Sequence, residues 1–214
     1  MNREKLTRIA MVLMIVFSFS GLLALFGGNV ANLTSITLLI GIVFYFVTRD
    51  AEEKDGMRLK AVPALLRDWK LDLLILMPLI MDIICFAVAK LAVPEFLEHL
   101  SRRIDFLSFG AIPLLIAELA IAALGEEIAW RGFFLNKLSK SLPFATALLI
   151  TAGLFSICHF STGSASVVLY DLLFIIINAV FYGIIYKKTN NILVCTLSHF
   201  LANLYGVFGL FLMR

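Results

Sequence analysis

Long runs of apolar residues constrain the fold of this chain more than any other feature of its sequence. Each run is about as long as a bilayer is thick, and seven are expected, at residues 9–27, 32–48, 71–92, 108–136, 143–160, 166–186 and 191–213. Because lipid offers no partner for backbone polar groups, each run is predicted to be a helix. Charged residues make up 15% of the 214 residues, whereas a soluble domain carries about 25%. The predicted fold class is all-α, a polytopic transmembrane helical bundle of about seven spans.

The basic residues predict how this bundle is oriented. With the N-terminus in the cytoplasm, 13 Lys and Arg residues fall on the cytoplasmic side and four on the outer side, the bias that membrane proteins show. We therefore expect a multi-pass integral membrane protein with its N-terminus in the cytoplasm and its C-terminus outside. Residues 49–70 alternate apolar and charged side chains, which predicts a short helix on the membrane surface. The net charge of +3 belongs to these loops, so the lipid bilayer is an expected partner and nucleic acid is not.

Ionisable residues inside an apolar span need a reason, because burying one in lipid costs about 2.5–3.5 kcal/mol on insertion scales. The run 108–136 carries Glu126, Glu127 and Arg131. Glu127 and Arg131 are four residues apart in the order that favours a charge pair on a helix. Consecutive helix positions are about 100° apart, so Glu126 points elsewhere, with no cation on its own turn. This pattern fits a general base, or alternatively a structural ion pair beside a spare glutamate at the membrane edge.

Two further spans each carry a histidine. Phe155 and His159 are four residues apart, as are His199 and Asn203, so each pair lies on one helix face. A carboxylate, two imidazoles and an amide supply a base, a proton carrier and two oxyanion donors, the groups that peptide hydrolysis needs. Straight spans would place Glu126 about 5 Å inward of the bilayer midplane and His159 about 10 Å outward. The two residues can cooperate only if helix tilt or a short fifth span closes this gap.

The three motifs, in this order, resemble the CPBP family of intramembrane proteases, which contains the CAAX prenyl endopeptidases and the bacteriocin-processing enzymes of the Abi type. The motifs are Glu126-Glu127-x-x-x-Arg131, Phe155-x-x-x-His159 and His199-x-x-x-Asn203, with Trp130-Arg131-Gly132 and Thr189-Asn190-Asn191-Ile192 as agreeing flanks. The resemblance covers residues 110–210. It divides the chain into N-terminal transmembrane spans with a cytoplasmic amphipathic segment, residues 1–106, and a catalytic transmembrane core, residues 107–214.

The resemblance implies an enzyme, a CAAX-type intramembrane peptidase that cleaves a membrane-embedded or lipidated peptide. The implied roles fall on the motif residues: water activation on Glu126 and His159, oxyanion stabilisation on His199 and Asn203, and structural support on Glu127 and Arg131. The alternative is a catalytically idle membrane protein that serves bacteriocin immunity or scaffolding. A transporter is disfavoured because the sequence shows no internal repeat.

A metal-free site is expected, with no cofactor. The sequence lacks the His-Glu-x-x-His motif of zinc proteases. Glu126, His159 and His199 are nevertheless residue types that bind zinc, so a zinc mechanism is the competing possibility.

The other notable residues of the spans are assigned structural roles. Asp82 and Asp171 are predicted to be local structural or snorkelling groups. Tyr182 is predicted to anchor its helix at the membrane interface. The three cysteines lie in apolar runs without metal-type spacing, and they are predicted to be packing residues rather than metal ligands or disulfide partners.

Overall fold

The structure, a computed structural model, describes residues 2–27, 33–49, 55–104, 107 and 110–213, and all regular structure within these residues is helical. Each predicted span overlaps one helix over most of its length. These helices are α1 (Arg3–Ser18) with the 3-10 helix η1 (Phe19–Phe26), α2 (Leu33–Thr48), α5 (Trp69–Ala92), α7 (Ile112–Glu127), α9 (Phe144–Ile157), α10 (Ala165–Thr189) and α11 (Ile192–Met213). The predicted all-helical bundle is confirmed.

Four helical segments are long and apolar enough to cross a membrane. They are Arg3–Phe26, Trp69–Ala92, Ala165–Thr189 and Ile192–Leu210. Two further apolar helices, within α2 and α9, are shorter. The helix α7 carries several carboxylates among its apolar residues and runs directly into the next helical segment. The chain is therefore an integral membrane protein, and the number of seven spans stays a prediction.

The segments between the long helices are short. The stretch after α2 forms η2 (Asp55–Met57), η3 (Leu59–Ala61) and α4 (Val62–Leu65). The described part of residues 49–70 thus contains short helices, of which α4 has Pro63 in its first turn; their position on the membrane surface stays a prediction, and residues 50–54 lie outside the described residues. The segment after α5 forms the amphipathic helix α6 (Glu95–Arg103), which buries Phe96, His99 and Leu100.

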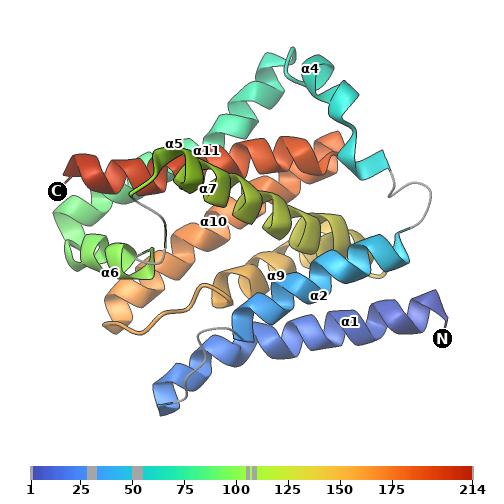
Figure 1. The fold of residues 1–214 in the computed structure, drawn as a ribbon, viewed down its shortest axis with the longest axis horizontal. Helices are drawn as coiled ribbons and strands as arrows, with labels where there is room; N and C mark the ends of the chain where they lie inside the picture. Colours follow the sequence, from blue (N-terminus) through green and yellow to red (C-terminus); the bar gives the residue numbers. More distant parts are fainter. Residues whose placement is uncertain (1, 28–32, 50–54, 105–106, 108–109, 214) are drawn as a thin grey trace.

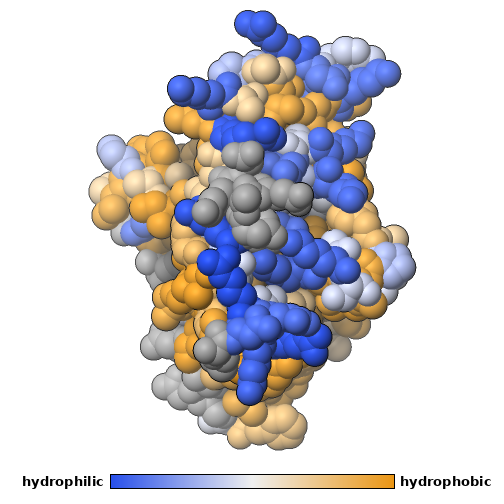
Figure 2. Space-filling view, turned by 90° about the vertical axis from the view of Figure 1, so that its right-hand side faces the viewer, coloured by the Kyte–Doolittle hydropathy of each residue, from blue (hydrophilic) through white to orange (hydrophobic). Residues whose placement is uncertain are grey.

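The helices α1, α2 and α11 run close to the long axis of the molecule, α5 and α10 cross it obliquely, and the two termini lie at opposite ends (Figure 1). The helices α1 and α2 pack together along one edge, α5 packs against α10 and α11, and α9 packs against α10. Seen from the end that carries the N-terminus, hydrophilic residues form a central band with apolar residues on both sides of it (Figure 2). This end has the polarity of a surface that faces water, whereas its flanks have the polarity of a surface that faces lipid.

A π-helical segment, η4 (Ile128–Leu135), follows the two glutamates directly and leads into α8 (Asn136–Leu138). Every residue of η4 is buried, and π-helical turns occur frequently at functional sites. The helix α2 approaches η4 closely: a Cβ atom on Gly41 would lie 2.5 Å from the Cβ of Ala129. Small residues permit such contacts between membrane helices. The helix α2 thus packs closely against η4, the segment that directly follows the two glutamates.

A tight turn joins α10 to α11. Asn190 ends α10 in the left-handed conformation with φ at 45°, which asparagine tolerates better than most residues. Thr189 Oγ1 accepts the backbone N–H of Asn191. The Asn191 side chain in turn accepts the backbone N–H of Leu193, which caps the start of α11. This turn determines which residues of α10 and α11 face each other.

Candidate active site

Glu127 and Arg131 form a buried ion pair at the junction of α7 and η4. Arg131 Nη1 donates to Glu127 Oε1 at 2.9 Å, and the two side chains are 1% and 0% exposed. Arg131 Nη2 also donates to the backbone carbonyl of Ala179 on α10 at 3.1 Å. The pairing predicted from the four-residue spacing is therefore confirmed, and the same arginine ties η4 to α10.

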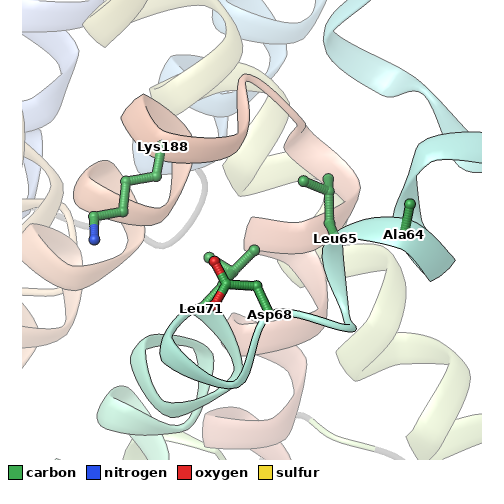
Figure 3. Close-up of a pocket in the computed structure, with 5 residues that line it drawn as sticks. All are labelled: Ala64, Leu65, Asp68, Leu71 and Lys188. Atoms are coloured by element: carbon green, nitrogen blue, oxygen red, sulfur yellow. The ribbon is translucent and has the colours of Figure 1, made fainter.

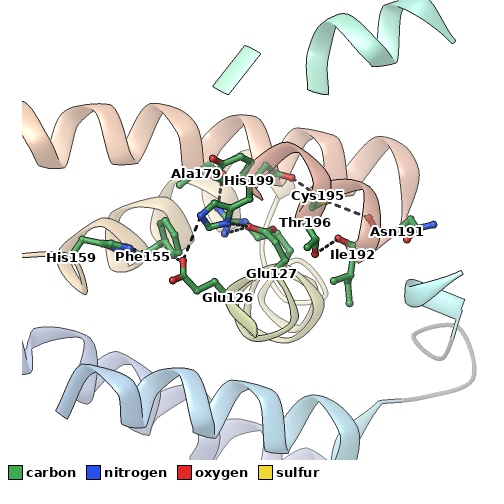
Figure 4. A network of polar contacts seen from close by, with 12 residues as sticks. Glu126, Glu127, Phe155, His159, Ala179, Asn191, Ile192, Cys195, Thr196 and His199 are labelled. Atoms are coloured by element: carbon green, nitrogen blue, oxygen red, sulfur yellow. Dashed lines mark hydrogen bonds and ion pairs between the residues drawn. The ribbon is translucent and has the colours of Figure 1, made fainter. Parts of the chain in front are cut away.

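Glu126 faces the two motif histidines (Figure 4). Its Oε2 lies 3.7 Å from His199 Nε2 and 4.0 Å from His159 Nε2, distances longer than a hydrogen bond. Among the described residues Oε2 is buried and has no hydrogen-bond partner. The Glu126 side chain is 22% exposed, whereas that of Glu127 is fully buried. The two adjacent glutamates thus have different surroundings, as the 100° offset predicts.

The hydrogen bonds of the histidine Nδ1 atoms assign the protons of both rings. His159 Nδ1 lies 2.8 Å from the carbonyl oxygen of Phe155, and because a carbonyl only accepts, Nδ1 carries a proton. His199 Nδ1 lies 2.8 Å from Glu127 Oε1, and an ionised carboxylate also only accepts. In the neutral rings both Nε2 atoms are therefore acceptors directed at the Glu126 carboxylate. Three converging acceptors require a shared proton or a donor between them, which is an arrangement suited to proton transfer.

Aromatic rings surround the Glu127–Arg131 pair. The Arg131 guanidinium lies 4.7 Å from the centre of the Phe155 ring and 5.0 Å from that of Tyr182. Tyr182 stacks on His199 at 4.5 Å with an interplanar angle of 19°. Phe155 also contacts the His159 ring at 4.6 Å. The rings fix the guanidinium and both imidazoles in one orientation.

The motif residues other than Asn203 thus meet in one cluster, which residues of α7, η4, α10, α11 and the end of α9 form. A comparison with known families shows what this cluster resembles. Residues 108–205 match the family model of the Rce1-like type II CAAX prenyl endopeptidases. The family resemblance predicted from the three motifs is confirmed, and this Rce1-like segment contains all of them. Searches of curated proteins and of solved structures found no match.

The expected difference in depth between Glu126 and His159 is closed in the Rce1-like segment. The helix α9 ends at Ile157 after 14 residues, about 21 Å at 1.5 Å per residue, which is shorter than the hydrocarbon core of a bilayer. His159 lies in the turn that follows and donates back to Phe155. The imidazole and the Glu126 carboxylate therefore lie within 4.0 Å of each other, as cooperation between them requires.

Asn203 lies one turn beyond His199 on α11 and is partly buried. Within the described residues no hydrogen bond joins its side chain to Glu126 or to either histidine. Its position on the same face as His199 agrees with the four-residue spacing. Its predicted function as an oxyanion donor stays a prediction.

Glu126, His159 and His199 are the residues that would hold a metal ion if one bound. In the part of the chain that the structure describes, no group of three or more His, Cys, Asp or Glu side chains has the geometry of a metal site. The two Nε2 atoms and the Glu126 oxygen would have to approach a common point at about 2 Å each to bind zinc.

The prediction that Tyr182 anchors its helix at the membrane interface is wrong. Tyr182 is 2% exposed, because its ring packs inside the bundle against His199 and the Arg131 guanidinium. No sequence spacing links Tyr182 to His199 or Arg131, since they lie on different helices. Only the residue types indicate this contact, because a tyrosine on one span can stack on the imidazole of a histidine on a neighbouring span.

Asp82 and Asp171 have structural partners, as predicted. Asp171 on α10 binds Arg103 of α6 and lies 3.5 Å from His99 Nε2. The same His99 nitrogen lies 3.0 Å from Ser161 Oγ. This cluster is not a nucleophilic triad, because serine and aspartate face one nitrogen instead of opposite sides of the ring. It fastens α6 to α10 and to the loop that follows His159.

Two surface cavities lie apart from the motif cluster. The larger, about 430 Å³, is lined by Ala64, Leu65, Asp68, Leu71 and Lys188, where α5 begins and α10 ends (Figure 3). The smaller, about 200 Å³, lies between η4, α8 and the end of α10. Neither is lined by a motif residue.

Proposed function

We propose that this protein is an intramembrane endopeptidase that hydrolyses a membrane-embedded or lipidated peptide with water activated by Glu126. The observation that carries the proposal is the convergence of the Glu126 carboxylate and two Nε2 atoms inside a segment that matches CAAX prenyl endopeptidases. A buried polar cluster in lipid is costly, and a structural role alone does not require a carboxylate oxygen that has no hydrogen-bond partner among the described residues and lies beside two imidazoles.

In the proposed reaction Glu126 removes a proton from water, and the hydroxide attacks the carbonyl carbon of the peptide bond. The proton then passes to the leaving amine nitrogen as the carbon–nitrogen bond breaks. His159 supports both transfers, because its Nε2 faces Glu126 while its Nδ1 is held by the Phe155 carbonyl. No group other than water is consumed.

The oxyanion that forms in the attack would be stabilised by His199 and Asn203. His199 donates through Nε2 only when the ring carries protons on both nitrogens, because Nδ1 already donates to Glu127. A carboxylate behind an imidazole holds the ring in place and stabilises its charged form as charge develops opposite it. Glu127 therefore positions His199 in addition to binding Arg131.

The proposed enzyme works within the bilayer. We place the N-terminus in the cytoplasm and the C-terminus outside, with seven spans, since the basic residues are biased toward one side. Its partners are the bilayer and the peptide or protein substrate in it, with no nucleic acid. No cofactor is required by the steps above.

The test is cleavage of a fluorogenic peptide that carries S-farnesyl cysteine in a C-terminal CAAX sequence, with the purified protein in proteoliposomes. Glu126→Gln keeps the shape but cannot accept the proton, so kcat should fall by several orders of magnitude, the scale of losing a general base being about 10²–10⁴. Glu118→Gln is the matched control, because Glu118 lies on the same helix two turns away, and it should cleave normally. Full activity of Glu126→Gln, or no cleavage by the unaltered protein, would leave the idle scaffold as the better reading.

A further inference from the structure

A second polar pair lies beside the motif cluster. Asn178 on α10 donates through Nδ2 to Asp82 Oδ1 on α5 at 2.7 Å. Asn178 is 9% exposed, and its Oδ1 is buried with no hydrogen-bond partner among the described residues. Because Asp82 holds the Nδ2 side of the amide, Oδ1 is directed away from Asp82. A buried acceptor left without a donor is costly, so its presence points to a donor that arrives with a ligand.

The pair lies close to the proposed catalytic residues. Ala179, next to Asn178, accepts from Arg131 through its carbonyl. Tyr182, one turn further along α10, stacks on His199. The unpartnered acceptor is therefore about one helical turn, or 6 Å along the axis, from the stacked rings.

The turn at Asn190 determines how residues of α10 and α11 match along the two helices. Tyr182 and His199 lie at matching distances on the two sides of this turn and are in contact. One turn further from it along the chain are Asn178 on α10 and Asn203 on α11. Asn178 and Asn203 are thus each one turn beyond the Tyr182–His199 contact, and Asn178 carries a buried acceptor without a partner among the described residues.

A peptide that is cleaved within a membrane presents the matching donor. Its backbone must be extended at the cleaved bond, so its N–H groups lose their helical partners, and lipid cannot replace them. Proteins that bind extended peptides satisfy these groups with acceptors of their own. A fixed acceptor one helical turn from Tyr182, which stacks on His199, can serve this purpose.

We propose that Asn178 Oδ1 accepts a backbone N–H of the bound substrate and so holds an extended peptide strand beside the proposed catalytic residues. Asp82 orients the Asn178 amide for this contact. The inference rests on the proposed function and adds how the substrate is held: through its backbone, independently of its side chains.

The experiment measures binding without turnover. The Glu126→Gln protein in lipid nanodiscs is titrated with the farnesylated CAAX peptide, labelled for fluorescence anisotropy, and with a series in which one amide at a time is replaced by an ester. Each ester removes one N–H and leaves the chain length unchanged. One ester near the cleaved bond should weaken binding by about tenfold, the scale of one buried hydrogen bond.

Two further variants, each made in the Glu126→Gln protein, locate the acceptor. With Asn178→Leu the parent peptide should bind about tenfold more weakly, and the sensitive ester should cause no additional loss. Tyr170→Phe is the matched control, since Tyr170 donates to the Cys85 carbonyl and so removes a different hydrogen bond between α10 and α5; the ester effect should persist there.

The proposal is overturned if no ester weakens binding, if the parent peptide does not bind, or if the ester effect is unchanged in Asn178→Leu. The first two results need no Asn178 variant, so the proposal can be refuted even if Asn178→Leu fails to fold. Failure of the proposed function appears differently, as absence of cleavage by the unaltered protein.

Discussion

Replacing Glu127 should separate stability from activity in this protein. In Glu127→Gln the Arg131 guanidinium stays buried, at 1% exposure, without its carboxylate. Removing one partner of a buried pair costs about 3–5 kcal/mol. Arg131 keeps the Ala179 carbonyl and the two ring faces, so we expect the lower end, about 3 kcal/mol. For a chain of this size that corresponds to a decrease in Tm of about 6–12 °C.

The assay can use the protein's own thiols. Cys85, Cys158 and Cys195 are free, two of them buried and one partly buried, so a maleimide dye should label them as the detergent-solubilised protein unfolds. The Tm of Glu127→Gln is compared with that of a second variant that also carries Arg131→Met. Because the double variant leaves no uncompensated charge, most of the lost Tm should return.

The activity of the double variant should stay low even though its Tm recovers. Glu127 also holds His199 Nδ1 at 2.8 Å, and Arg131→Met does not replace that contact. The double variant should therefore fold well and cleave the farnesylated peptide slowly, with the loss mainly in kcat. An unchanged Tm for Glu127→Gln together with complete loss of turnover would refute this reasoning and make Glu127, instead of Glu126, the candidate base.

Three further results are expected. Asn203→Ala should lose about 2.7–4 kcal/mol of transition-state stabilisation, or about 10²–10³ in kcat, with a smaller change in KM; an unchanged kcat would remove Asn203 from the oxyanion site. Tyr182→Phe should keep the stack on His199 and its turnover, whereas Tyr182→Leu should lower kcat at equal folded yield, and equal kcat for both would show that the stack has no effect on the reaction. Activity should survive chelation, and elemental analysis should find no stoichiometric zinc; loss on chelation with recovery on adding zinc would establish the competing mechanism through Glu126, His159 and His199.

Local spacing explains which parts of the site were predictable. Glu127 and Arg131 pair because they are four residues apart on one helix, and helical geometry alone predicts that contact. The spans were predictable from local sequence as well. The apolar run 32–48, for example, predicts a helix that closely matches the observed α2, Leu33–Thr48. The π-helical geometry of η4 depends on packing around the whole segment. The spacing of apolar residues in the sequence therefore does not predict it.

Contacts between distant helices were not predictable in this way. The stack of Tyr182 on His199 depends on the Asn190 turn, which determines the register of two helices. The bond between Asn178 and Asp82 joins residues 96 apart in the sequence. Such pairs are set by how helices cross, a property of the assembled bundle that one sequence does not reveal.

The close approach of α2 to η4 limits how this chain can be divided. The Rce1-like match begins at residue 108, yet the surface of η4 behind the glutamates is completed by Gly41, and Tyr45 packs against Gly132 in the same helix. A fragment that starts at residue 108 would expose this face to lipid or to another copy. Expressed together as two separate chains, residues 1–106 and 107–214 should find each other in the membrane, with Gly41 as the contact on which reassembly depends. Gly41→Leu should block that complementation, while the same change in an exposed position of α2, Val43→Leu, should not.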